Sequence, residues 1–284
     1  MNRHICIILF IIVGSSCNQV QSNGKKLTPD TFQVNAKQKP ITLPAAIVNK
    51  EKILDSLAQS MIASANSYAE TGSVVKEEEF ISQFVKVLGA ANTFSYNFPS
   101  LTKYNITLKV SADKQLKIYS WQSPYSGSMW HIQNILQYMS IDKQTIAASF
   151  NNLYEQKDDG TGPSPVLDRI YKIDNSSAVQ YLLIGYGQMS GTEPYSVAHL
   201  LNITNHKFNI NKRLFNINKK LDNEIYISVN VGENQDINTL RKKMAISYDV
   251  TNRYITYPLT KEIDNEIVLS GETRKLEFKN GVFK

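Results

Sequence analysis

Short runs of alternating apolar and polar residues, separated by turn residues, follow one another from Thr93 to the C-terminus. Alternation with period two is typical of strands. The runs Ile106–Val110 and Leu116–Trp121 flank Asp113-Lys114, which predicts a hairpin. Further strands are predicted near 129–138, 145–154, 166–173, 179–186, 196–203, 207–217, 224–231, 243–249, 253–257, 266–269 and 273–278. This region is therefore expected to form a predominantly antiparallel β meander, either a sandwich, a barrel or a propeller-like array.

Two helices are predicted before the β region. Pro44 stands where a first helical turn would begin, and apolar residues recur at helical spacing through about Tyr68. A second helix is predicted from Ser73 to a stop at Gly89, with the run Glu77-Glu78-Glu79 beside the positive end of its dipole. A metal site is the alternative interpretation of that Glu run. The predicted fold class is α+β, with N-terminal helices followed by the β meander.

A weak internal repeat accompanies the strands. The segment Leu116–Tyr138 runs strand, Ser-Gly loop, strand, and Tyr181–Ile203 repeats this order. A more divergent third copy is predicted at Ile225–Tyr248, with Gly232 in its loop. The unequal spacings favour duplicated hairpins over a regular propeller.

The N-terminus has the pattern of an export signal. Arg3 precedes an apolar run over 5–13, and small residues then lead to Cys17. Small residues directly before a cysteine resemble a bacterial lipobox, in which the cysteine is lipidated and becomes the new N-terminus. An ordinary signal peptide with a chance cysteine is the alternative. The predicted organisation is a signal peptide, a lipidated tether and a single domain (1–16, 17–43, and 44–284, which is helical over 44–90 and mainly β over 93–284).

A lipid at Cys17 would determine both location and chemistry. Acyl chains such as palmitate hold a protein at a membrane because each buried methylene contributes about 0.8 kcal/mol. No acidic cluster follows Cys17, which favours the periplasmic face of the outer membrane over the cell surface. The formal net charge of +6 comes from interspersed residues without a basic stripe, so no nucleic-acid partner is expected. Lipidation would also remove the mature chain's last free thiol.

Several strand motifs resemble a known group of proteins. The run Leu116–Trp121 with its Tyr-Ser-Trp ending, the following Gly127-Ser128-Met129, the later Tyr181–Gly187 and the terminal Leu276–Phe283 are similar to an uncharacterised family of Bacteroidota lipoproteins. The resemblance covers about half the chain. It implies a terminal hairpin and no catalytic residues.

Motifs for catalysis and metal binding are incomplete. Ser111 and Lys114 match the Ser-x-x-Lys motif of penicillin-recognising enzymes, but they stand in a predicted hairpin without the partner Lys-Thr-Gly strand. The sequence has no Gly-x-Ser-x-Gly elbow and no His-Glu-x-x-His pair. His131 and His199 occupy similar places in the two repeats and could approach each other, or could be half-buried residues with backbone partners. No catalytic residue, metal or cofactor is predicted.

An aromatic group is the most suggestive binding feature. If the repeated hairpins are neighbours, their loops 122–128 and 187–195 would lie together, and aromatic faces there could stack on a sugar or clasp a peptide. Packing of these rings in a β core is the alternative, and Trp121 should share the environment of Tyr119 on the same strand face. The candidate ligand-binding residues are Trp121, Tyr125, Trp130, His131, Tyr186 and His199.

Two functional hypotheses follow. The first is a lipid-anchored, noncatalytic protein of the bacterial cell envelope that binds a protein or glycan partner. The second is an envelope glycan hydrolase, which would need two carboxylates about 5–10 Å apart in an open cleft beside Trp121 or Trp130.

Overall fold

The computed structural model describes residues 45–65, 74–153, 164–173, 179–210, 213–232 and 235–284. The predicted signal peptide, Cys17 and the tether lie outside these residues. Contacts divide the chain into two units at Thr42/Leu43, and the second unit contains every described element. No described helix is long and apolar enough to cross a membrane.

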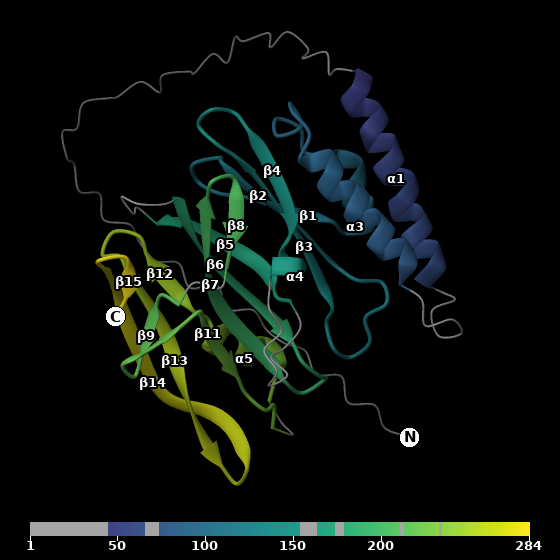
Figure 1. Cartoon of the computed structure of the whole chain (residues 1–284). Helices are drawn as coiled ribbons and strands as arrows, with labels where there is room; N and C mark the ends of the chain where they lie inside the picture. The colour runs from purple at the N-terminus through teal and green to yellow at the C-terminus, as the bar shows by residue number, and fades with distance from the viewer. Residues whose placement is uncertain (1–44, 66–73, 154–163, 174–178, 211–212, 233–234) are drawn as a thin grey trace, which may run out of the picture. The chain divides into compact units, whose positions relative to one another are not determined.

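Two helices form the first layer of this unit (Figure 1). They are α1 (Ala45–Ala65) and α3 (Val75–Leu88), followed by the 3-10 helix η1 (Pro99–Tyr104). Apolar residues at helical spacing bury one face of each helix, including Leu54 and Met61 on α1 and Phe80 and Phe84 on α3. Both helices were predicted. Gly89 ends α3 in a right-handed conformation, donating its N–H to the carbonyl of Val85.

The first sheet is an antiparallel meander in the order β1-β2-β3-β4. Its strands, and the short helix that follows them, are β1 (Thr107–Val110), β2 (Leu116–Gln122), β3 (Ile132–Met139), β4 (Thr145–Ser149) and α4 (Phe150–Leu153). The predicted hairpin is confirmed: Ser111 and Leu116 close the turn, and Lys114 adopts a positive φ of 57°. The strand predicted over 145–154 stops at Ser149.

The second sheet is also antiparallel, in the order β11-β7-β6-β5, with β8 paired to β7; β5, β6 and β7 form a meander, and β11 joins β7 from later in the chain. Its strands are β5 (Val166–Ile173), β6 (Val179–Gln188), β7 (Pro194–Thr204), β8 (Lys207–Asn209) and β11 (Glu224–Ser228). The β6–β7 hairpin is the predicted counterpart of the β2–β3 hairpin, and it holds Leu183 opposite His199.

The third sheet has the order β10-β9-β15-β14-β13-β12. Its strands are β9 (Phe215–Ile217), β10 (Lys220–Asp222), β12 (Ser247–Asp249), β13 (Tyr254–Ile263), β14 (Glu266–Lys279) and β15 (Val282–Phe283). The pairing of β15 with β9 is parallel, whereas its other pairings are antiparallel. The helix α5 (Ile237–Lys243) connects the second sheet to the third.

Three hydrophobic clusters join these layers, because alternate residues of a strand point to opposite faces. On β2, Tyr119 packs toward the helices while Ile118 packs toward the second sheet. On β6, Leu183 faces the first sheet while Leu182 faces the third. The first and second sheets therefore have neighbours on both faces, which explains why nearly every residue of β2 and β7 is buried.

The α+β class is confirmed in its coarser form, helices followed by mostly antiparallel sheets. No described sheet closes on itself. The third repeat predicted at Ile225–Tyr248 is wrong, because this segment contains β11, α5 and β12 and passes from one sheet to another.

Candidate functional site

Two of the predicted binding residues lie in the core. Trp121 is only 3% exposed and packs edge-on against Phe80, with ring centroids 5.4 Å apart. Tyr119, on the same face of β2, is buried as well. Tyr125 is buried, and its hydroxyl donates to the carbonyl of Met61 at 3.3 Å. These rings therefore hold the helices against the first sheet and cannot contact a ligand at the surface.

Trp130 and Tyr186 do come together. Their ring centroids are 6.4 Å apart in an edge-to-face arrangement. The backbone N–H of Trp130 donates to the backbone carbonyl of Gln188 at 3.0 Å. The ends of the two repeated hairpins are thus neighbours, which is the condition on which their loops were expected to lie together. Arg241 of α5 covers the Trp130 ring at 4.5 Å and donates to the side chain of Gln188. Because a guanidinium occupies one indole face, the group packs α5 against the hairpins.

The two histidines have different surroundings. His131 is exposed, whereas His199 is 2% exposed. The His199 Nδ1 lies 3.6 Å from a Glu224 carboxylate oxygen, and its ring packs on Phe150. No group of three or more His, Cys, Asp or Glu residues in the described ranges is arranged to hold a metal ion.

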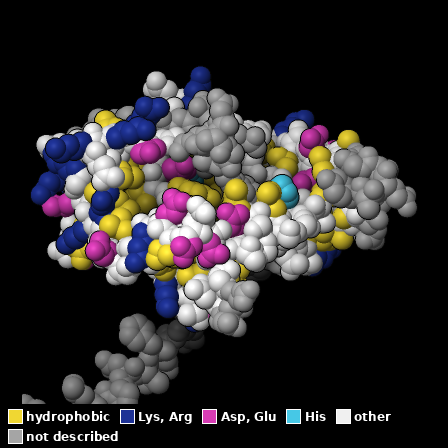
Figure 2. Space-filling model, turned by 90° about the horizontal axis from the view of Figure 1, so that it is seen from below, with side chains coloured by type: hydrophobic (Ala, Val, Ile, Leu, Met, Phe, Trp, Pro, Cys, Tyr) yellow, Lys and Arg dark blue, Asp and Glu magenta, His cyan; other side chains and the backbone are white. Residues whose placement is uncertain are grey.

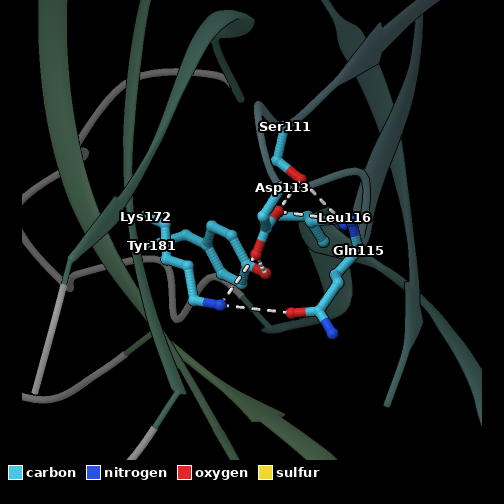
Figure 3. Close-up of polar contacts among 6 residues, drawn as sticks. All are labelled: Ser111, Asp113, Gln115, Leu116, Lys172 and Tyr181. Carbon is cyan, nitrogen blue, oxygen red and sulfur yellow. Dashed lines mark hydrogen bonds and ion pairs between the residues drawn. The ribbon is translucent and has the colours of Figure 1, made fainter. Parts of the chain in front are cut away.

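A polar cluster centred on Asp113 joins the β1–β2 turn to the second sheet (Figure 3). One carboxylate oxygen accepts from the Ser111 hydroxyl at 2.5 Å and from the Gln115 N–H at 3.2 Å. The other accepts from the Tyr181 hydroxyl at 2.8 Å and pairs with Lys172 at 3.0 Å. Burial raises the pKa of Asp113, but these contacts together outweigh it and lower that pKa.

The same cluster decides the chemistry of Ser111. Its hydroxyl donates to Asp113 and accepts the Leu116 N–H at 2.9 Å, while Lys114 occupies the turn. The Asp113 carboxylate accepts the Ser111 hydroxyl, but its other contacts lower its pKa and so make it a weak base for activating the serine. The Ser-x-x-Lys match is therefore structural.

Sequence reasoning missed the role of Glu77. This residue is only 4% exposed and accepts hydrogen bonds from Trp121 Nε1 at 3.2 Å, the Ser123 hydroxyl at 2.9 Å and Gln133 Nε2 at 3.3 Å. Burial raises its pKa, although these donors and the charge of His131 oppose the shift. Helical spacing could have indicated that Glu77 is buried, because it lies three residues before Phe80 on the buried stripe of α3.

An open groove lies between α5 and the β13–β14 hairpin, and we name it the α5 groove. It encloses about 720 Å³. Its lining residues are Val229, Asn230, Gln235, Asp236, Thr239, Leu240, Lys243, Pro258, Val268, Leu269, Gly271, Glu272 and Thr273. Figure 2 views the molecule from the hairpin end and shows hydrophobic and acidic side chains interleaved in the middle of this face, with Lys and Arg gathered over the third sheet.

The acidic side chains of the α5 groove have different roles. Asp236 is the N-cap of α5, and its carboxylate accepts the Thr239 N–H at 2.8 Å and the Thr239 hydroxyl at 2.7 Å. These bonds lower the pKa of Asp236, so it stays ionised and is a poor proton donor near neutral pH. Glu272 is exposed. Gly271, at φ 88°, precedes it within β14 and leaves open space where a side chain would stand.

No family model, curated protein or solved structure matches this chain. Its candidate site is therefore interpreted from its own geometry.

Proposed function

We propose that the protein is a lipid-anchored, noncatalytic binding module of the bacterial cell envelope, and that the α5 groove is its ligand site. One observation carries the proposal: the groove is open and is lined by amides, hydroxyls and side chains of both charges. The Asp236 carboxylate in this lining is hydrogen-bonded as the N-cap of α5. Such a surface offers many hydrogen bonds, and its capping carboxylate is a poor general acid.

The alternative of a glycan hydrolase has less support. That chemistry needs two carboxylates facing an open cleft beside Trp121 or Trp130. Trp121 is buried, and Trp130 is packed between Tyr186 and Arg241. The hairpin ends that would have formed the cleft are held together by the Trp130–Gln188 hydrogen bond.

The groove can be tested by charge reversal. The Glu272→Lys variant changes an exposed lining residue, and Glu262→Lys is the matched control on β13 outside the groove. Envelope proteins and glycans retained by the immobilised domain would be compared between the two variants. We expect Glu272→Lys to lose a partner that Glu262→Lys keeps. Equal retention by both variants, or release of shortened glycan, would contradict the proposal.

The anchor needs a separate test. Cells expressing the full chain or its Cys17→Ser variant would be labelled with radioactive palmitate. We expect label only on the chain with Cys17, and the variant should leave the membrane fraction. Equal labelling of both chains would exclude Cys17 as the site of lipidation.

A further inference from the structure

A second groove lies between α3 and the outer edge of the first sheet, and we name it the β4 groove. It encloses about 700 Å³. Its lining residues are Glu78, Ile81, Ser82 and Val85 on α3, Gln133 on β3, Ala147, Ala148 and Ser149 on β4, and Asn151, Asn152 and Leu153 beside them. It shares no residue with the α5 groove.

One side of this groove is an edge strand. β4 pairs with β3 from Thr145 to Ser149 and ends the sheet, so its outer edge meets no other strand in the described part of the chain. An edge strand presents backbone N–H and C=O groups that can pair with another extended chain. Proteins usually prevent such pairing with a charged residue, a proline or a bulge on the edge.

β4 lacks these protections. Its sequence, Thr-Ile-Ala-Ala-Ser, contains no charge and no proline, and its pairing with β3 has no bulge. Every other edge strand among the described residues has at least one charged side chain (Lys109 on β1, Arg169 on β5, Lys207 on β8, Lys220 on β10, Glu224 on β11 and Asp249 on β12). Among the described edge strands, β4 is therefore the one without a charged side chain, and it is the one beside the β4 groove.

The other side of the groove is one stripe of α3. Glu78, Ile81, Ser82 and Val85 follow the helical spacing i, i+3, i+4, i+7, so they form a continuous wall. Ile81 and Val85 are half-buried, whereas Ser82 and Glu78 are exposed. This wall offers apolar contacts along its length with a carboxylate on its rim.

The floor is already hydrogen-bonded. Asn151 donates to the Gln133 side chain at 3.0 Å and to the Ile132 carbonyl at 2.9 Å, and Gln133 donates to Glu77. These amides therefore hold the floor in place. The other polar groups of the lining are the side chains of Ser82, Ser149 and Asn152 and the carboxylate of Glu78, which is the one charged lining residue. The outer edge of β4 adds its backbone groups.

We propose that the β4 groove binds an extended segment of another protein, which adds to the first sheet as a further strand beside β4. A helix beside an edge strand is a geometry that suits strand addition, with backbone bonds giving affinity and side-chain contacts giving specificity. The three β4 residues that line the groove, Ala147–Ser149, span about 10 Å at about 3.3 Å per residue, which sets the length of the paired part of the segment. Its side chains should be apolar at alternate positions, with a Lys or Arg opposite Glu78. This inference is independent of the α5 groove and of the lipid.

The probe is a library of random dodecapeptides displayed on phage and selected on the domain 44–284. We expect selected peptides to alternate apolar and polar residues and to contain Lys or Arg. On binding, NMR shifts should concentrate at the backbone amides of Thr145–Ser149. Selected peptides without a basic residue, or shifts confined to other strands, would overturn the proposal.

Two matched pairs of variants test the walls. Glu78→Lys should weaken a selected peptide about fivefold, the scale of an exposed ion pair, whereas Glu79→Lys, which changes an exposed residue outside the groove, should not. Ser82→Trp should fill the groove and abolish binding, whereas Lys86→Trp, also at an exposed α3 position, should not.

These substitutions are on the surface of α3, and circular dichroism would check that each variant folds. Unchanged affinity in Ser82→Trp would overturn the proposal. Binding that appears only after deletion of residues 154–163 would also overturn it, because the occupant would then be the chain's own segment after Leu153.

Discussion

Two buried ionisable residues, Glu77 and Lys117, lie where the helices meet the first sheet. Neither forms an ion pair with an opposite charge in the described residues; each is held by neutral groups. Lys117 donates to the carbonyls of Phe94 and Tyr96 and to the side chain of Asn97. Alternation along β2 predicted that Tyr119 and Trp121 share a face. It did not predict the carbonyl groups that accept from Lys117 on the same face, because these belong to the loop before η1.

Replacing Glu77 with Gln should flatten the dependence of stability on pH. Because burial raises the pKa of folded Glu77 above 4.5, the unfolded chain loses this proton first as pH rises. The contribution of Glu77 is therefore greatest at low pH and falls from about pH 4.5 up to the folded pKa. Urea unfolding at a series of pH values should show the Glu77→Gln variant gaining stability relative to wild type as pH rises through this window. A constant difference would contradict the expectation.

Lys117→Met should reveal the opposite slope at high pH. Burial lowers the pKa of Lys117 to about 8 from an unfolded value of 10.5. Burying the charged Lys117 therefore lowers the free energy of unfolding most below pH 8. As pH rises from 8 toward 10.5, the folded chain loses this charge and the free energy of unfolding recovers by about 3 kcal/mol. Wild type should gain stability over this range relative to Lys117→Met. Lys109→Met, at a more accessible position on β1, is the control that should show no such gain.

At the scale of elements, long periodic helices and regular hairpins were predicted well, and short or interrupted elements were not. α5 was missed because seven residues give too little periodicity to distinguish a helix. Its Asp236-x-x-Thr239 cap was the usable signal. β14 was predicted as two strands, 266–269 and 273–278, with Gly271 in the gap between them. It is one strand with a shifted register between Pro258 and Thr260 on its partner β13.

Loss of the α5 cap should be measurable. Asp236→Ala removes the acceptor for two backbone N–H groups and should cost about 0.5–2 kcal/mol of unfolding free energy. Asp236→Asn keeps an acceptor and should cost much less. Amide exchange at Asn238 and Thr239 would show whether the loss is local. Equal destabilisation by both variants would mean that the charge matters more than the cap.

At the scale of the whole molecule, the sequence predicted helices before sheets but not how the sheets stack. Alternation identifies two faces of a strand without identifying what covers each face. The β2 sequence has Lys117, Tyr119 and Trp121 on one face and Leu116 and Ile118 on the other, and both faces are buried. The partners of those faces are sixty or more residues away on β6, or on the preceding helices, which local patterns do not report.

A cavity in the cluster between the first and second sheets should destabilise the entire unit. Leu183 is fully buried there, and Leu183→Ala should cost about 2–5 kcal/mol. Because the clusters share strands, fluorescence from Trp121, which packs between β2 and the helices, should report the same shifted midpoint as far-ultraviolet circular dichroism when it is measured in a Trp130→Phe background. Separate transitions for the two probes would show that the layers unfold independently. Leu221→Ala, at an exposed position on β10, is the control.

The burial of β6 on both faces also affects how the chain can tolerate mutation. In β14, outer positions are exposed, so a scan of all substitutions should show tolerant and intolerant positions interspersed. In β6, from Gln180 to Gly185, every residue is buried, and a Cβ added at Gly185 would lie 2.5 Å from the Val166 carbonyl oxygen. Intolerance there should be continuous, as it should be along the buried run of β7, which would make these two strands slow to change as related sequences diverge.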